Sequence, residues 1–145
     1  MPKISLKKLF TRANHLKLMV DYCIIDPEIV DALRQIKTLD VKTTLECGYH
    51  PWTADETLVA GTTEKDRLLI TANYRDITPA RYPPCKHGGI ILIKHPSPSG
   101  QIVFERMRSF ALKGGRSHAK GHVTYLNADT AEIRKLDEEI IKLQF

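Results

Sequence analysis

Short apolar runs separated by amphipathic stretches predict a sheet of buried strands joined by helices. Residues 68–70 are Leu-Leu-Ile with no helical period, and residues 16–20 and 88–94 form two more such runs. Runs of this length are typical of strands buried on both faces of a parallel sheet. Residues 40–46 alternate loosely and contain β-branched side chains, and residues 123–126 predict a last strand.

Helical periodicity fills the intervals between these runs. Asp26 is followed by Pro and Glu, which predicts an N-cap and the first turn of a helix over residues 27–37. A second helix opens at Thr53 or Ala54, and a third is marked by apolar residues from Ile102 to Ala111 and ends at Gly114-Gly115. The alternation of strands and helices predicts an α/β fold, a three-layer α/β/α sandwich with a mostly parallel central sheet.

The tail that begins at Thr130 fits two patterns. Its apolar residues recur at helical spacing, at Ile133, Leu136, Ile140 and Leu143. We therefore expect a helix there. The alternative is that residues 132–136 pair back on the last strand as a hairpin.

Length and charge restrict the kind of protein. The chain has 145 residues, so we expect one domain over residues 16–145, preceded by a basic N-terminal arm over residues 1–15. The arm could be a short helix on the domain or a solvated leader. No apolar stretch approaches the ~20 residues of a membrane span, so we expect a cytoplasmic protein with no membrane partner. The net charge of +5 favours a polyanionic partner.

The cysteines are odd in number and widely spaced, at Cys23, Cys47 and Cys85. This pattern predicts free thiols rather than a disulfide framework or a zinc site. Cys85 and His87 offer two metal ligands, but nothing completes the four of a closed zinc site.

Polar side chains gather directly after two of the predicted strands. Asp21 follows the first strand, and Asn73 and Asp76 follow the strand over residues 68–70. Asp55 and Glu56 stand in the first turn of the second helix, where acids also simply suit the helix dipole. Because strand carboxyl ends and helix amino ends share one edge of a parallel sheet, we expect these side chains to reach a common cleft.

Carboxylates gathered at one edge predict a metal site. They repel one another unless a proton or a cation intervenes. Oxygen ligands favour Mg²⁺ or Mn²⁺ over zinc, and such an ion supports attack of water on a phosphodiester. The sequence contains no P-loop, HExxH or Ser and Cys triad signature that would indicate another chemistry.

Three sequence blocks resemble the PIN-domain ribonucleases. They are Val20-Asp21 followed by a helix, residues 53–58 (Thr-Ala-Asp-Glu-Thr-Leu) and residues 69–77 (Leu-Ile-Thr-Ala-Asn-Tyr-Arg-Asp-Ile). Their order and spacing are similar to those of the short PIN-like group related to the Mut7-C domain and to VapC-type toxins. The resemblance covers about residues 16–93.

The resemblance implies a Mg²⁺- or Mn²⁺-dependent endoribonuclease with a PIN-like fold. Such proteins are often homodimeric and often the toxin that an antitoxin protein neutralises. By position, it implies metal binding by Asp21, Asp55 and Asp76, catalysis by these and Asn73, and accessory roles for Glu56 and Thr71. Asn73 and Ile77 depart from the family pattern, in which Asp and Phe are common. Glu46 is the candidate for the further acid of longer PIN domains.

Basic and aromatic side chains near the expected cleft offer contacts for RNA. The basic candidates are Arg75, Arg81, Lys86, Arg116, His118 and Lys120. Exposed Lys and Arg are also the norm on protein surfaces. The aromatic candidates for stacking on bases are Tyr49, Trp52 and Tyr74, and their alternative role is to pack over the edge of the core.

Two functions from different classes follow. The first is a metal-dependent ribonuclease, and the second is a catalytically weak or inactive PIN-like module that binds RNA or a protein partner. A flavodoxin-like receiver or nucleotide binder is a weaker third, because the chain lacks a glycine-rich phosphate loop.

Overall fold

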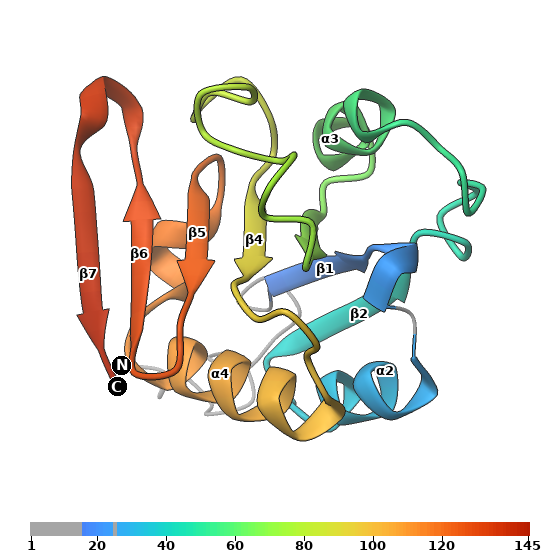
Figure 1. Cartoon of the computed structure of the whole chain (residues 1–145), viewed down its shortest axis with the longest axis horizontal. Helices are drawn as coiled ribbons and strands as arrows, with labels where there is room; N and C mark the ends of the chain where they lie inside the picture. The colour runs from blue at the N-terminus through green and yellow to red at the C-terminus, as the bar shows by residue number, and fades with distance from the viewer. Residues whose placement is uncertain (1–15, 25) are drawn as a thin grey trace, which may run out of the picture.

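A seven-stranded sheet in the order β2-β1-β3-β4-β5-β6-β7 organises the chain (Figure 1). The coordinates are a computed structural model that describes residues 16–24 and 26–145, so the expected arm over residues 1–15 lies outside the described residues. The strands are β1 (Leu16–Val20), β2 (Leu39–Thr43), β3 (Leu68–Thr71), β4 (Ile90–Ile93), β5 (Val123–Leu126), β6 (Thr130–Arg134) and β7 (Ile140–Gln144). Neighbours from β2 to β5 are parallel, and β6 and β7 are added antiparallel.

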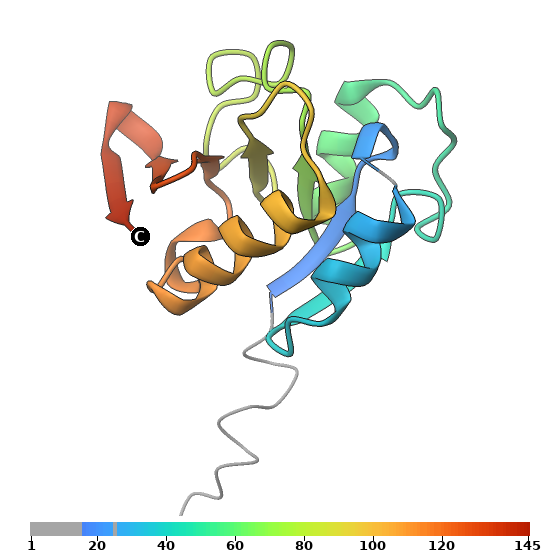
Figure 2. The same ribbon diagram turned by 60° about the horizontal axis from the view of Figure 1, so that its bottom comes forward.

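Helices cover both faces of this sheet, which confirms the predicted α/β class and is compatible with a three-layer sandwich. The α-helices are α2 (Pro27–Arg34), α3 (Asp55–Glu64), α4 (Gly100–Leu112) and α5 (Arg116–Ala119). Figure 2 shows α2 and α4 side by side on one face, with α3 on the other. None of the helices in the described part of the chain is long and apolar enough to cross a membrane.

Alternation along the strands divides the apolar residues between two cores. Leu18 and Val20 point into the core beneath α2 and α4, whereas Met19 points into the core beneath α3. Ile70 and Leu69 of β3 divide in the same way, and both are fully buried. The predicted apolar runs are continuous because both faces of the central strands are covered.

Local signals at the start of α2 are confirmed. Asp26 is the N-cap, and its Oδ1 accepts a hydrogen bond of 2.8 Å from the Glu28 N–H. Pro27 occupies the first helical position, where no N–H is needed. The helix ends at Arg34, a few residues before the predicted end.

The predicted C-terminal helix is wrong, because the tail forms the hairpin β6–β7. β6 pairs with β5 in the register Val123↔Arg134 to Leu126↔Ala131, which is the alternative that the sequence left open. Asp137 and Glu138 make the turn with φ of 60° and 62°. Glycine is the residue that usually occupies left-handed positions in hairpin turns, and this turn contains none. The sequence therefore lacks the usual sign of a hairpin turn here. Ala131 and Ile133 are both buried and lie two positions apart, which is the spacing of one face of a strand. The helical spacing of the apolar residues from Ile133 onward pointed instead to a helix.

The order of the strands places a crevice between β1 and β3. The chain passes from β1 to β2 on one side of β1, and then crosses to β3 on its other side. Such a reversal is the topological switch point of an open α/β sheet, where ligands bind beyond the carboxyl ends of the strands.

We expect Gly100→Ala to destabilise the protein, because Gly100 begins α4 where this helix approaches α2 closely. A Cβ at Gly100 would lie 2.9 Å from the Glu28 carbonyl oxygen, so α4 would have to move away from α2. Gly→Ala within a helix usually stabilises by roughly 0.5–1 kcal/mol. Here we expect a loss of roughly 1–3 kcal/mol, measured by urea denaturation. Gln101→Ala, at the exposed next position, is the control, and an unchanged or higher stability of Gly100→Ala would contradict the close approach.

Candidate functional site

A pocket of about 400 Å³ opens at the carboxyl edge of the sheet, by the switch point between β1 and β3. Its lining includes side chains from four segments: Asp21, Cys23, Pro51, Thr53, Asp55 and Asn73. The expectation that strand ends and a helix start meet in one cleft is therefore confirmed for Asp21, Asp55 and Asn73.

Asp21 is held at the end of β1 by the sheet itself. Its N–H donates to the Ile70 carbonyl at 2.9 Å, which continues the pairing of β1 with β3. The Asp21 side chain is only 7% exposed, so its carboxylate needs a hydrogen-bond donor. The Thr71 hydroxyl supplies one by donating to Asp21 Oδ2 at 2.7 Å.

Thr71 also organises the turn that follows β3. Its Oγ1 accepts a hydrogen bond of 3.1 Å from the Asn73 N–H. The Asn73 side chain then donates from Nδ2 to Asp55 Oδ2 at 3.3 Å. A continuous chain of hydrogen bonds therefore links Asp21 at the end of β1 to Asp55 at the start of α3.

Cys23 is a site residue that the sequence analysis missed. The short 3₁₀ helix η2 (Tyr22–Ile24) turns the chain directly after Asp21 and brings the thiol back to the carboxylate. Cys23 Sγ lies 3.5 Å from Asp21 Oδ2 and 3.4 Å from Thr71 Oγ1. The available signal in the sequence was that Cys23 lies only two positions after Asp21, the acid at the end of the strand. Burial and the Asp21 charge raise the pKa of this thiol, so it is unsuited to act as a thiolate nucleophile.

The environment of Asp55 raises the pKa of its carboxyl above the ordinary value. Partial burial is the largest cause, and the negative charges of Asp21, Asp76 and Glu56 add to it. The Arg81 guanidinium acts in the opposite direction. The carboxylates are thus close enough to repel one another, which is the condition that a bound cation relieves.

Asp76 and Glu56 lie near the pocket without lining it. Both are exposed, and Asp76 acts on Asp55 through its charge. Glu56 pairs with Arg81, at 3.3 Å between Oε1 and the guanidinium. The implied metal ligands are therefore only partly assembled, with Asp21 and Asp55 in the pocket and Asp76 beside it.

The donor set fits a hydrated hard cation and does not fit zinc. Within residues 16–24 and 26–145, no group of three or more His, Cys, Asp or Glu side chains is arranged to hold a metal. Mg²⁺ usually keeps several waters and takes one or two carboxylates from the protein, with further oxygens from substrate phosphates. Asp21 and Asp55 meet that requirement, and the pKa of Asp55 is raised first by burial and then by the neighbouring carboxylates.

Two weaker candidates have structural roles elsewhere. Glu46 is not a pocket residue, because its Oε1 accepts from the Thr43 N–H at 2.9 Å and pairs with Arg34 at 2.7 Å. These partners lower the pKa of its carboxyl, the Thr43 backbone bond most. His87 is buried, with both ring nitrogens in contact with backbone atoms, so it does not form a metal site with Cys85. All three cysteines are free, as predicted.

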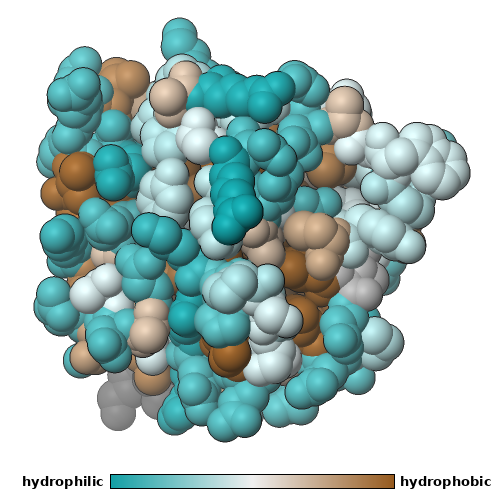
Figure 3. All heavy atoms as spheres, viewed as in Figure 1, coloured by the Kyte–Doolittle hydropathy of each residue, from teal (hydrophilic) through white to brown (hydrophobic). Residues whose placement is uncertain are grey.

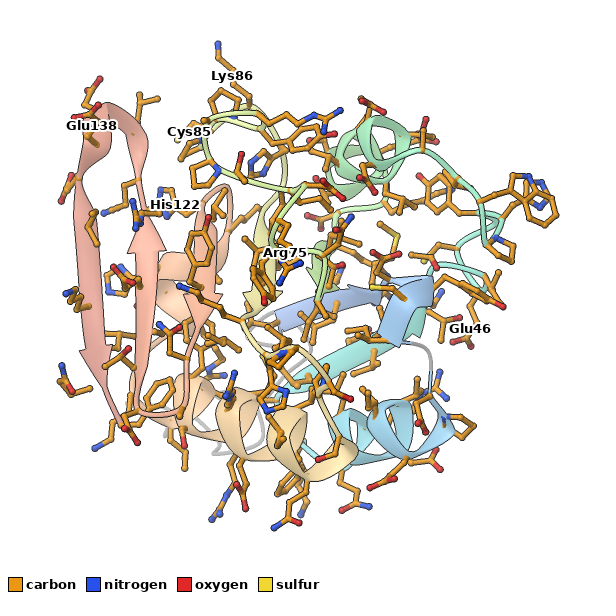
Figure 4. All side chains as sticks on the ribbon, in the orientation of Figure 1. Glu46, Arg75, Cys85, Lys86, His122 and Glu138 are labelled. Atoms are coloured by element: carbon orange, nitrogen blue, oxygen red, sulfur yellow. The ribbon has the colours of Figure 1, made fainter. Side chains whose placement is uncertain are left out.

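The expected RNA-binding side chains are spread over both edges of the sheet. Arg75 and Arg81 follow β3 on the pocket side, and Figure 4 shows Arg75 near the middle of the molecule. Lys86 lies far from it on the loop before β4, and the neighbouring Cys85 N–H donates to the Gly121 carbonyl near the start of β5. Lys120 pairs with Asp66 at 3.8 Å at this same amino edge. The remaining candidates, Arg116 and His118, belong to α5, which precedes β5.

The aromatic candidates separate into two kinds. Tyr49 and Tyr74 pack against the core beneath α3, which was their alternative role. Trp52 is the exception, since it is exposed on the loop before α3.

We expect Thr71→Val to destabilise the protein by roughly 1–3 kcal/mol, because it removes a donor from a buried carboxylate and an acceptor from the Asn73 N–H. Thr71→Ser keeps the hydroxyl and should lose less, although it deletes a buried methyl group. Urea denaturation of the two variants distinguishes them. A Val variant that is more stable than the Ser variant would contradict the proposed role of the hydroxyl.

Asp55→Asn should raise the free energy of unfolding at neutral pH, because a neutral amide costs less to bury than a carboxylate and no longer repels Asp21. The folded pKa of Asp55 lies above the unfolded value of about 3.8, so the wild-type penalty is present at neutral pH and disappears as the pH falls through the folded pKa. The advantage of the variant should therefore shrink in acid. Denaturation at several pH values measures this difference. Asp31→Asn on the exposed face of α2 is the control, and a variant less stable than wild type at neutral pH would contradict the repulsion.

Comparison with family models, with curated proteins and with solved structures finds no significant match to the chain. The likeness to PIN-domain ribonucleases therefore rests on the three sequence blocks alone, and it stays a prediction.

Proposed function

We propose that this chain is a Mg²⁺- or Mn²⁺-dependent endoribonuclease of the PIN-like type. The supporting observation is that Asp21 and Asp55, from separate parts of the chain, line one pocket beside the switch point. Their mutual repulsion helps to raise the pKa of Asp55, which makes a cation a favourable occupant. The composition supports a phosphate-bearing substrate, since the net charge is +5.

The residues divide into those that hold a cation and those that position them. Asp21 and Asp55 would hold the metal ion, which when bound supplies charge neutralisation and activation of water for attack on a phosphodiester. Thr71 fixes one carboxylate oxygen of Asp21, and Asn73 links the turn after β3 to Asp55. Arg75 would attract the phosphates of the substrate, and its contacts would provide affinity without sequence choice.

The partners implied by the resemblance belong to the same proposal. They are a single-stranded RNA substrate, an antitoxin protein and a second copy of the chain, with activity in the cytoplasm. None of these is needed to explain the pocket itself.

A specific observation also favours the second candidate, a PIN-like module that binds RNA or a protein partner with little or no cleavage. Only two carboxylates line the described pocket, and Asn73 stands where the family pattern commonly has Asp. Fewer charged ligands hold a cation more weakly, so a higher ion concentration would be needed to fill the site.

We expect wild type to cleave single-stranded RNA with Mn²⁺ and to lose this activity with EDTA. Asp21→Asn should reduce cleavage by at least about a hundredfold, because a neutral amide is a poorer ligand than a carboxylate. Gel analysis of a labelled oligoribonucleotide measures the cleavage. Asp26→Asn is the matched control, since asparagine caps a helix as well as aspartate does.

Thermal unfolding with and without Mn²⁺ separates the two candidates. A bound ion at a hundred times its dissociation constant stabilises the folded state by about 2.7 kcal/mol, and Asp21→Asn should abolish that gain. Stabilisation without cleavage would favour the binding module. Wild type that neither cleaves RNA nor is stabilised by any divalent cation would refute the metal site.

A further inference from the structure

Trp52 stands in the chain between two residues that line the pocket, and it belongs to neither core cluster. Its side chain is 81% exposed, and it is the only tryptophan in the sequence. It lies on the loop between β2 and α3, which projects at the right of Figures 1 and 3. The residues on either side of it, Pro51 and Thr53, both line the pocket that contains Asp21 and Asp55.

The segment that carries Trp52 is closed by reciprocal hydrogen bonds. The His50 N–H donates to Thr53 Oγ1 at 2.8 Å, and the Thr53 N–H donates to the His50 carbonyl at 3.1 Å. The next residue, Ala54, is the N-cap of α3, and its carbonyl accepts from the Leu58 N–H at 3.1 Å. A ligand therefore meets a loop whose conformation is already set, which lowers the entropy lost on binding.

The indole and the His50 imidazole form a parallel pair. Their ring centroids are 5.4 Å apart and their planes differ by 4°, which is an offset stack. Since Trp52 remains largely exposed, this contact holds the plane of the indole without covering it. The result is a flat, oriented aromatic surface beside the pocket.

We infer that Trp52 stacks on a nucleobase of a single-stranded RNA whose backbone enters the pocket, an inference that rests on the proposed function. Every base presents a π face, so an oriented indole binds single strands without reading their sequence. In a duplex the bases are already stacked on one another, which restricts this subsite to single strands, loops and ends. A phosphate beside Asp21 and Asp55 and a base on Trp52 are the adjoining parts of one nucleotide chain.

The intrinsic fluorescence of Trp52 reports this contact directly, because no other tryptophan contributes. The full-length chain is titrated in Ca²⁺, a hard cation that also takes oxygen ligands, with an eight-nucleotide oligoadenylate and with an abasic strand of equal length and charge. Gel analysis after the titration verifies that the strands stay intact. We expect saturable quenching by the oligoadenylate and much weaker quenching by the abasic strand. Equal quenching by both, or quenching by neither, would overturn the inference.

Substitutions of Trp52 measure how much its side chain contributes to the affinity for RNA. Trp52→Ala should weaken oligoadenylate binding by about 5- to 150-fold in fluorescence anisotropy of an end-labelled strand, whereas Trp52→Phe should retain most of the affinity. Leu112→Ala is the matched control, since this leucine of α4 is 72% exposed and does not line the pocket. Affinity unchanged in Trp52→Ala would overturn the inference and favour a protein surface at this loop.

The failure of the stacking subsite and the failure of the nuclease proposal can be told apart. Quenching and the loss of affinity in Trp52→Ala, without Mn²⁺-dependent cleavage, would refute the nuclease and keep the stacking subsite. Cleavage by wild type with unchanged affinity in Trp52→Ala would keep the nuclease and remove the subsite.

Discussion

The hydroxyl group of Thr71 is the interaction on which the pocket depends. It donates to the buried carboxylate of Asp21 and accepts from the N–H of Asn73, so one side chain of a central strand serves two adjoining segments. A buried carboxylate without a donor is costly, and an unpaired N–H adds to that cost. Because Thr71 lies in β3 between β1 and β4, sheet pairing rather than loop conformation determines where the acidic group stands.

The pocket gathers negative charge within a chain whose net charge is positive. Burial and neighbouring carboxylates both disfavour the ionised form of Asp55, while Arg81 partly compensates. A fold selected for stability alone would separate such groups, so their proximity points to a function. The same site then gains from a cation, and the net charge of +5 of the whole chain favours a polyanion; these are the two occupants of the proposed nuclease.

Sequence patterns were sufficient where the cause is local and insufficient where it is long-range. The cap at Asp26 and the strand that ends just before Asp21 depend on adjacent residues, and the shared edge follows from parallel pairing. The turn at Asp137 was missed because no glycine marks its left-handed backbone, which instead joins two strands held by the pairing of β6 with β5 and of β7 with β6. The ion pairs of Glu46 with Arg34 and of Lys120 with Asp66 depend on which distant segments of the chain meet. The spacing of residues along the sequence does not reveal such contacts.

The two walls of the pocket differ in how they are anchored. Asp21 extends from a strand with neighbours on both sides, so exchange of its amide hydrogen requires the centre of the sheet to open. Asp55 begins a helix whose N-cap, Ala54, makes no side-chain capping bond, and the first turn of such a helix frays more readily. The sheet side of the pocket is therefore fixed by strand pairing on both flanks, whereas the helix side depends on the first turn of α3, whose amide hydrogens we expect to exchange earlier than that of Asp21.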